Sequence, residues 1–157
     1  MPLTADHDLR SRAAARAAPP PGIELAVAAG SDALRQAAAI QNSAYGAPEP
    51  TAADVARLQH TVDAGGVVGL AREVNRGVAS GLVAAPSDGF AELAAVGVLP
   101  AWRRRGIAAA LTGTLGRAAF DRGVPVLMLM AHEAEQAVYA RAGFTVASGI
   151  IFISIPT

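Results

Sequence analysis

Residues 96–111 combine an apolar strand, a turn with three consecutive arginines and an alanine-rich helix, and this combination constrains the fold more than any other segment. The strand is expected to end at Pro100, because proline has no N–H to donate to a neighbouring strand. The first N–H groups of the following helix lack intrahelical partners and lie at the positive end of the helix dipole. Together with the arginines at 103–105 they form an anion site, and Gly106 and Ala108 leave room for a phosphate. The segment therefore predicts a strand–turn–helix unit that binds a diphosphate-bearing ligand.

Hydrophobic patterns along the rest of the chain predict an α/β fold with a mixed sheet. Apolar and β-branched runs indicate strands, and apolar residues that recur every three or four positions indicate helices. The run at 124–130 is almost wholly apolar, so this strand is expected to be buried on both faces. Strands are predicted at 23–29, 67–73, 78–85, 90–99, 124–130 and, as one or two strands, 144–155. Helices are predicted from 30–32 to 44, from the cap Thr51 to 63, from 104 to 121 and from 133 to 141.

The chain has 157 residues, which suits one compact domain. Three prolines and a glycine at 19–22 indicate that residues 1–22 form a flexible leader and that residues 23–157 form the domain. No apolar run reaches the roughly 20 residues that a membrane helix needs. The first residues also lack the layout of a secretory signal, so a cytoplasmic location is expected.

The composition excludes several kinds of chemistry. Thirteen basic and thirteen acidic residues balance to a formal charge of zero, so no attraction to nucleic acid or to an anionic membrane is expected. All basic residues are arginine, which excludes a Schiff-base or general-base lysine. Cysteine is absent, which excludes disulfides, thiolate metal sites and a cysteine acyl-enzyme. An acyl transfer must therefore go directly to the acceptor or through an oxygen nucleophile.

Two segments carry a family resemblance. The turn and the strand before it resemble the acetyl-CoA signature of the GNAT N-acetyltransferase superfamily, (Gln or Arg)-x-x-Gly-x-(Gly or Ala) behind a strand that ends Val-x-Val-x-Pro. A later segment resembles the Tyr-x-x-x-Gly-Phe element of the same family. The residues are Arg103-Arg104-Arg105-Gly106-Ile107-Ala108 behind Val96-Gly97-Val98-Leu99-Pro100, and Val138-Tyr139-Ala140-Arg141-Ala142-Gly143-Phe144. A solvated basic helix start or an RNA patch is the alternative interpretation of the arginines.

The resemblance implies a fold, a co-substrate and roles for particular residues. It implies the GNAT fold, a mixed central sheet of six or seven strands with helices on both faces, and acetyl-CoA as co-substrate with no metal. The N–H of Val96 would polarise the thioester carbonyl, Val98 would pair with the pantetheine amides, and Tyr139 would protonate the departing thiolate. Tyr139 could equally serve only to pack its helix on the sheet. Contacts to acetyl-CoA are implied for Val96, Gly97, Val98, Arg103, Arg104, Arg105, Gly106, Ile107, Ala108, His132 and Tyr139.

One of these positions departs from the family pattern. His132 stands where many members carry an asparagine that hydrogen-bonds the cofactor. It could replace that donor or face solvent at the start of the helix.

The base and the acceptor site are less sharply indicated. Glu92 precedes Arg103 by the offset at which some family members place their general base, and it could act directly, through water or as a substrate anchor. Its alternatives are a solvent-facing glutamate or an arginine partner. By resemblance the acceptor pocket lies at the first two helices and their loop, where Tyr45 and Glu49 are candidates with Glu92. Further polar candidates are Asp54, His60 and Asp88.

The sequence thus predicts an N-acetyltransferase that moves an acetyl group from acetyl-CoA directly to a primary amine of a small molecule or peptide. The alternative is a GNAT-like sensor or interaction module that binds acyl-CoA without catalysis. Homodimers are common in the family, and the apolar tail at 149–155 could pair across such an interface.

Overall fold

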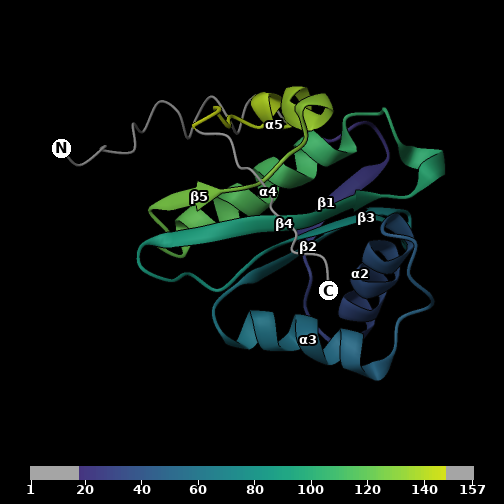
Figure 1. Ribbon diagram of the computed structural model, residues 1–157. Coiled ribbons are helices and arrows are strands. Elements are labelled where there is room, and N and C mark those ends of the chain that lie inside the picture. The colour runs from purple at the N-terminus through teal and green to yellow at the C-terminus, as the bar shows by residue number, and fades with distance from the viewer. Residues whose placement is uncertain (1–17, 148–157) are drawn as a thin grey trace, which may run out of the picture.

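The computed structural model describes residues 18–147, which form one five-stranded sheet with helices on both faces. The strands follow one another in the order β1-β2-β3-β4-β5; all neighbours are antiparallel except β4 and β5, which are parallel. Helices α2 and α3 cover one face, and α4 and α5 lie on the other (Figure 1). In chain order the elements are β1 Ile23–Val27, α2 Ser31–Ala44, α3 Ala52–Asp63, β2 Val67–Glu73, β3 Arg76–Val83, β4 Phe90–Val98, η1 Pro100–Trp102, α4 Ile107–Asp121, β5 Val126–Met128, η2 Glu133–Glu135 and α5 Gln136–Arg141.

The mixed sheet with helices on both faces was predicted and is confirmed, with five strands in the described residues instead of six or seven. Residues 144–147 form no strand, and the rest of the strand region predicted at 144–155 lies outside the described residues. The leader predicted at 1–22 also lies mostly outside them. None of the helices within residues 18–147 is long and apolar enough to cross a bilayer.

Helix α4 packs closely on strands β2 and β3 of the sheet. Leu111 and Leu115 of α4 are fully buried against β2 and β3. A Cβ at Gly69 or Gly81 would lie 2.9 to 3.0 Å from the side chain of Leu115, so glycine at both positions lets the helix sit this near. A second apolar core fills the space between the sheet and the other helices, and its fully buried members include Leu34, Leu58, Val68 and Leu70.

The prediction that the strand within 124–130 is buried on both faces is wrong for the described residues. Strand β5 spans only Val126–Met128, and Val126 and Met128 are 46% and 47% exposed. Leu127 points to the opposite face and packs on the core beneath α4. The apolar run therefore covers one face of the sheet only, and its outward side chains meet no helix in this part of the chain.

Strand β4 is irregular, and the site depends on this irregularity. Its pairing with β3 shifts register opposite Ser80–Leu82, and Ala95 adopts a positive φ of 55°. A positive φ in a residue with a Cβ is uncommon and marks a local bulge. On its other edge β4 pairs with β5 only along Phe90, Ala91 and Glu92. Past Glu92 the two strands diverge, which leaves that edge of β4 without a strand partner in the described residues.

Candidate functional site

A cavity of about 620 Å³ opens where β4 and β5 diverge. It lies between the second half of β4, the turn before α4 and one side of α5. Strand, helix start and covering helix thus surround one elongated space. Its walls are formed by Ala44, Tyr45, Val96, Gly97, Val98, Trp102, Arg103, Arg104, Gly106, Ile107, Ala108, Ala109, Glu135, Val138 and Arg141.

The turn before α4 presents backbone N–H groups to this cavity. Helix α4 begins at Ile107 and not at 104 as predicted, because Arg104 and Gly106 adopt positive φ angles of 62° and 82° that no α-helix accommodates. The first hydrogen bond of the helix runs from Ala110 N to Gly106 O at 3.1 Å. The N–H groups of residues 107–109 therefore precede the intrahelical ladder, and all three residues line the cavity. A helix start of this kind stabilises anions.

The three arginines of the turn point in different directions. Arg103 and Arg104 line the cavity, and the Arg103 Nε donates to the carbonyl oxygen of Val98 at 3.0 Å. Arg105 is not among the lining residues; its guanidinium lies 3.6 Å from a carboxylate oxygen of Glu73 at the end of β2. Two of the three predicted anion ligands thus face the cavity.

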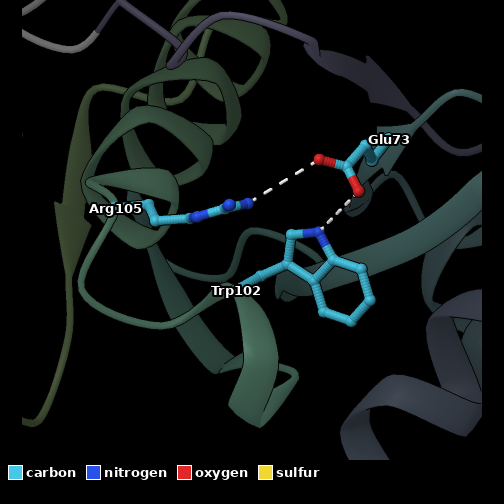
Figure 2. Close-up of polar contacts among 3 residues, drawn as sticks. All are labelled: Glu73, Trp102 and Arg105. Carbon is cyan, nitrogen blue, oxygen red and sulfur yellow. Dashed lines mark hydrogen bonds and ion pairs between the residues drawn. The ribbon is translucent and has the colours of Figure 1, made fainter.

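Trp102 connects the turn to the β2–β3 hairpin. Its indole N–H donates to Glu73 Oε2 at 3.0 Å, so Glu73 holds both Trp102 and Arg105 (Figure 2). The guanidinium of Arg76 lies 4.7 Å from the centre of the Trp102 ring, within cation–π range. Since Trp102 lines the cavity, these contacts fix one of its walls.

Tyr139 lies on α5 and is half-buried. Its ring packs edge-on against Phe144, with centroids 6.5 Å apart and planes at 77°. Burial raises the pKa of the Tyr139 phenol above its usual value of 10.0, and the nearby Glu135 and Tyr45 raise this pKa further. The phenol is therefore protonated at neutral pH, the state that a proton donor requires.

A second, smaller cavity of about 240 Å³ lies on the α2–α3 side of β4. The two cavities share Tyr45, and the consecutive residues Ala95 and Val96 line one each. This places two binding spaces on either side of one strand. The lining residues of the smaller cavity are Gln41, Asn42, Tyr45, Ala47, Arg57 and Ala95.

Five predicted site residues line neither cavity, and two of them, Arg105 and Tyr139, are described above. Glu92 is partly buried on β4, opposite Met128 and three residues before Ala95, the first residue of β4 that lines a cavity. Glu49 is exposed in the loop between α2 and α3. His132 is exposed, and its backbone N–H donates to a carboxylate oxygen of Glu135 at 3.2 Å.

The structure also brings in residues that sequence reasoning did not single out: Gln41, Asn42, Arg57, Glu73 and Glu135. The adjacent amides at the end of the first predicted helix, directly before the predicted acceptor loop, were the one local signal that could have indicated two of them. Within residues 18–147, no group of three or more His, Cys, Asp or Glu side chains could hold a metal ion.

Comparison with known proteins gives a consistent result. The model of the acetyltransferase (GNAT) family matches residues 34–144, whereas no curated protein matches the chain. An acetyltransferase structure from Trypanosoma brucei is similar with a TM-score of 0.70 and 20% identity, covering 85% of this chain and 99% of that one. The structure of AAC(6')-Iy with the bisubstrate analogue CoA-S-monomethyl-acetylneamine gives a TM-score of 0.70, 16% identity and coverage of 86% and 99%. Glucosamine-6-phosphate N-acetyltransferase from Arabidopsis thaliana is similar with a TM-score of 0.69 and 13% identity, covering 85% of this chain and 99% of that one.

Proposed function

Because the chain belongs to the GNAT acetyltransferase family, we propose that this acetyltransferase moves the acetyl group of acetyl-CoA directly to a primary amine. The observation that carries the proposal is the pair of cavities on either side of β4 that meet at Tyr45. One has the anion-binding helix start that a diphosphate needs, and the other offers space for a small acceptor. An amine bound in the second cavity would approach β4 at its bulge.

The larger cavity suits acetyl-CoA. The N–H groups of residues 107–109, with Arg103 and Arg104, would hold the diphosphate. The free edge of β4 at Val96 and Val98 offers backbone groups to the amides of the pantetheine arm. Gly97 lies next to Ala44 of α2, which also lines this cavity, and keeps the strand close to that helix.

The catalytic roles rest on the position of Val96 in the cavity wall and, for Tyr139 and Glu92, on their places in the family pattern. The N–H of Val96 would stabilise the oxyanion that forms as the amine nitrogen bonds to the thioester carbon. As the carbon–sulfur bond breaks, Tyr139 would donate its phenolic proton to the leaving sulfur. Tyr139 does not line the larger cavity itself, but its neighbour Val138 on α5 does. Glu92 lines neither cavity, so we assign it removal of the amine proton through water. The absence of cysteine excludes a cysteine acyl-enzyme, and direct transfer to the amine needs no covalent enzyme intermediate.

At the acceptor end, Tyr45 would contact the substrate directly, because it lines both cavities. Glu49 lies in the loop that follows Tyr45 and would meet only the outer part of a larger acceptor, such as a peptide. The AAC(6')-Iy and glucosamine-6-phosphate N-acetyltransferase neighbours are compatible with an amine acceptor. We further propose that the protein is cytoplasmic, that it forms a homodimer, and that it has no nucleic-acid or membrane partner. The zero formal charge supports the last of these proposals.

Titration of the purified protein with acetyl-CoA and CoA in a calorimeter tests the donor site. Acetyl-CoA should bind at micromolar concentration, and an Arg104→Glu/Gly106→Asp variant should lose this binding. Gly123→Asp is the matched control, because Gly123 also has a positive φ (85°) and open space around it but lies at the far end of α4. No binding near millimolar acetyl-CoA would contradict the proposal.

Turnover with a panel of primary amines then separates the enzyme from the non-catalytic sensor. The positions of Glu92 and Tyr139 outside the linings of both cavities are the observations that favour the sensor. The enzyme should release CoA in an amine-dependent reaction and be slowed by Glu92→Gln. A sensor would bind acetyl-CoA equally well, release no CoA and be indifferent to Glu92→Gln.

A further inference from the structure

The geometry points to an acceptor amine that also carries an anionic group, a carboxylate or a phosphate, which the guanidinium of Arg57 binds. This inference rests on the proposed function and specifies the class of its substrate. Arg57 is the only charged residue among the described residues that line the smaller cavity. It comes from α3, whereas Ala95, beside the reacting strand position Val96, forms the opposite boundary on β4.

The guanidinium of Arg57 is available for a ligand. Within the described residues it makes no hydrogen bond and no ion pair. Asp54, one turn earlier on α3, interacts electrostatically with Arg57, but its Oδ2 accepts from the Thr51 N–H at 2.8 Å, from the Thr51 hydroxyl at 2.9 Å and from Asn42 at 3.5 Å. Asp54 therefore lowers the net positive potential near Arg57 without taking up its donors. An arginine with free donors in a cavity is suited to bind carboxylate or phosphate oxygens.

A second polar residue of the cavity, Gln41 of α2, offers an acceptor for the amine. Gln41 is 4% exposed, and its Nε2 donates to the buried Ser80 hydroxyl at 3.2 Å. Because Nε2 makes this bond, Oε1 is the atom of the amide left to receive a ligand N–H, and no hydrogen bond from a described residue to Oε1 is seen. Ser80 pairs with Gly97 in the register of β3 and β4, which places Gln41 at the reacting strand. An amine near Gln41 and an anion at Arg57 would therefore span the cavity.

Cationic acceptors fit this cavity poorly. No aspartate or glutamate lines it in the described part of the chain, and Glu49 and Glu92, the carboxylates predicted at the acceptor site, both lie outside its walls. A polyamine would bring a second positive charge toward Arg57, and like charges disfavour binding. The cavity thus selects against polyamines as well as for anionic amines.

Matched acceptor pairs test the inference. We would measure kcat/KM at saturating acetyl-CoA for glucosamine 6-phosphate against glucosamine, and for an α-amino acid against its carboxamide, with spermidine as a cationic probe. Each pair removes the anionic group; because the carboxamide also has a lower amine pKa than the amino acid, kcat/KM is compared per unprotonated amine. The measurements would be repeated for Arg57→Gln and for Arg35→Gln, an exposed arginine of α2 that lines neither cavity. Calorimetry with CoA would monitor the donor site in every variant.

We expect the anionic member of at least one pair to exceed its neutral partner by about 10- to 100-fold in kcat/KM, the usual worth of a charge-assisted hydrogen bond. In Arg57→Gln, kcat/KM for the anionic acceptor should fall to that for the neutral acceptor, while kcat/KM for the neutral acceptor and the affinity for CoA stay unchanged. Arg35→Gln should alter none of these quantities. Equal or better turnover of neutral amines or spermidine, unaltered by Arg57→Gln, would overturn this inference and leave the proposed function standing. CoA binding with no acetylation of any amine would overturn the proposed function and this inference with it.

Discussion

The indole N–H of Trp102 donates to a carboxylate oxygen of Glu73 at 3.0 Å, and this bond ties the turn after β4 to the end of β2. The same carboxylate holds Arg105 at 3.6 Å, while Arg103 and Arg104 face the cavity. Glu73 therefore positions one wall of the donor site from a distant part of the sequence. It does so without lining the cavity itself.

Removal of the Glu73 carboxylate should weaken acetyl-CoA binding. Glu73→Ala frees both Trp102 and Arg105, and we expect the KM for acetyl-CoA to rise about 10-fold with little change in kcat, as for loss of uniform binding. Glu73→Gln keeps an acceptor for the indole and loses only a half-exposed ion pair, so its effect should be small. Trp102 is the only tryptophan, so its emission reports directly on this wall. The Trp102 emission should shift to the red in Glu73→Ala but not in the control variant Glu24→Ala. An unchanged KM for acetyl-CoA would contradict the role of Glu73 in positioning this wall.

Tyr139→Phe should separate catalysis from binding. Loss of the proton donor is expected to lower kcat by about 100-fold with unchanged KM for acetyl-CoA. Because the folded-state pKa is raised, the folded chain retains this proton above pH 10. The stability that follows is present below pH 10 and is lost as the pH rises through the folded-state pKa. Denaturation at several alkaline pH values should therefore show a steeper loss of stability in the wild type than in Tyr139→Phe. An unchanged kcat would leave Tyr139 a packing residue only.

The cap of α3 should give an acid-dependent stability. Thr51 Oγ1 accepts from the Asp54 N–H, and the Asp54 carboxylate accepts from the Thr51 N–H and hydroxyl, which lowers the pKa of Asp54 below 3.8. Thr51→Ala should cost about 1 kcal/mol of unfolding free energy. The carboxylate contribution is present above pH 3.8 and is lost as the pH falls through the lowered pKa. The stability gap between the wild type and Asp54→Asn, measured by thermal denaturation, should accordingly close in acid; a gap independent of pH would argue against the ionised cap.

Two glycine-to-alanine substitutions should have opposite effects on stability. A Cβ at Gly97 would lie 2.6 Å from the Cβ of Ala44, which the helix backbone holds in place, so Gly97→Ala should destabilise the fold by about 1–3 kcal/mol. At Gly116 within α4 the nearest atom, in Leu127, is 3.7 Å away. Gly116→Ala should therefore be stabilising by about 0.4–1 kcal/mol. Urea denaturation of both variants decides this, and a neutral Gly97→Ala would show that β4 and α2 can separate.

Local features were predictable from the sequence. Strand β2 was predicted with its observed bounds, Val67–Glu73, because glycines precede it and a tight turn follows it. The cap Thr51 was also predicted and is confirmed, since capping depends on residues close in sequence. The arginine-rich turn was placed correctly before a helix, although the left-handed conformation of Arg104 delays the helix to Ile107.

Features that depend on long-range contacts were not predictable. The partnership of Arg105 with Glu73 and the presence of Arg57 in the smaller cavity arise from tertiary packing. No local sequence pattern indicates that Arg105 binds Glu73 or that Arg57 lines a cavity. The burial expected for the β5 region failed for a related reason, because hydrophobicity alone does not say which face of a strand another element covers.

The boundary formed by Ala95 and Val96 has a consequence for how acceptor preference can change among proteins of this design. One peptide unit of β4 separates the two cavities, so a substitution there would disturb the thioester position and the acceptor position together. Arg57 on α3 and Gln41 on α2 border the acceptor space alone. Divergence or engineering toward a new amine can therefore proceed by substitutions on these two helices. Residues of the strand border both cavities and are expected to change less.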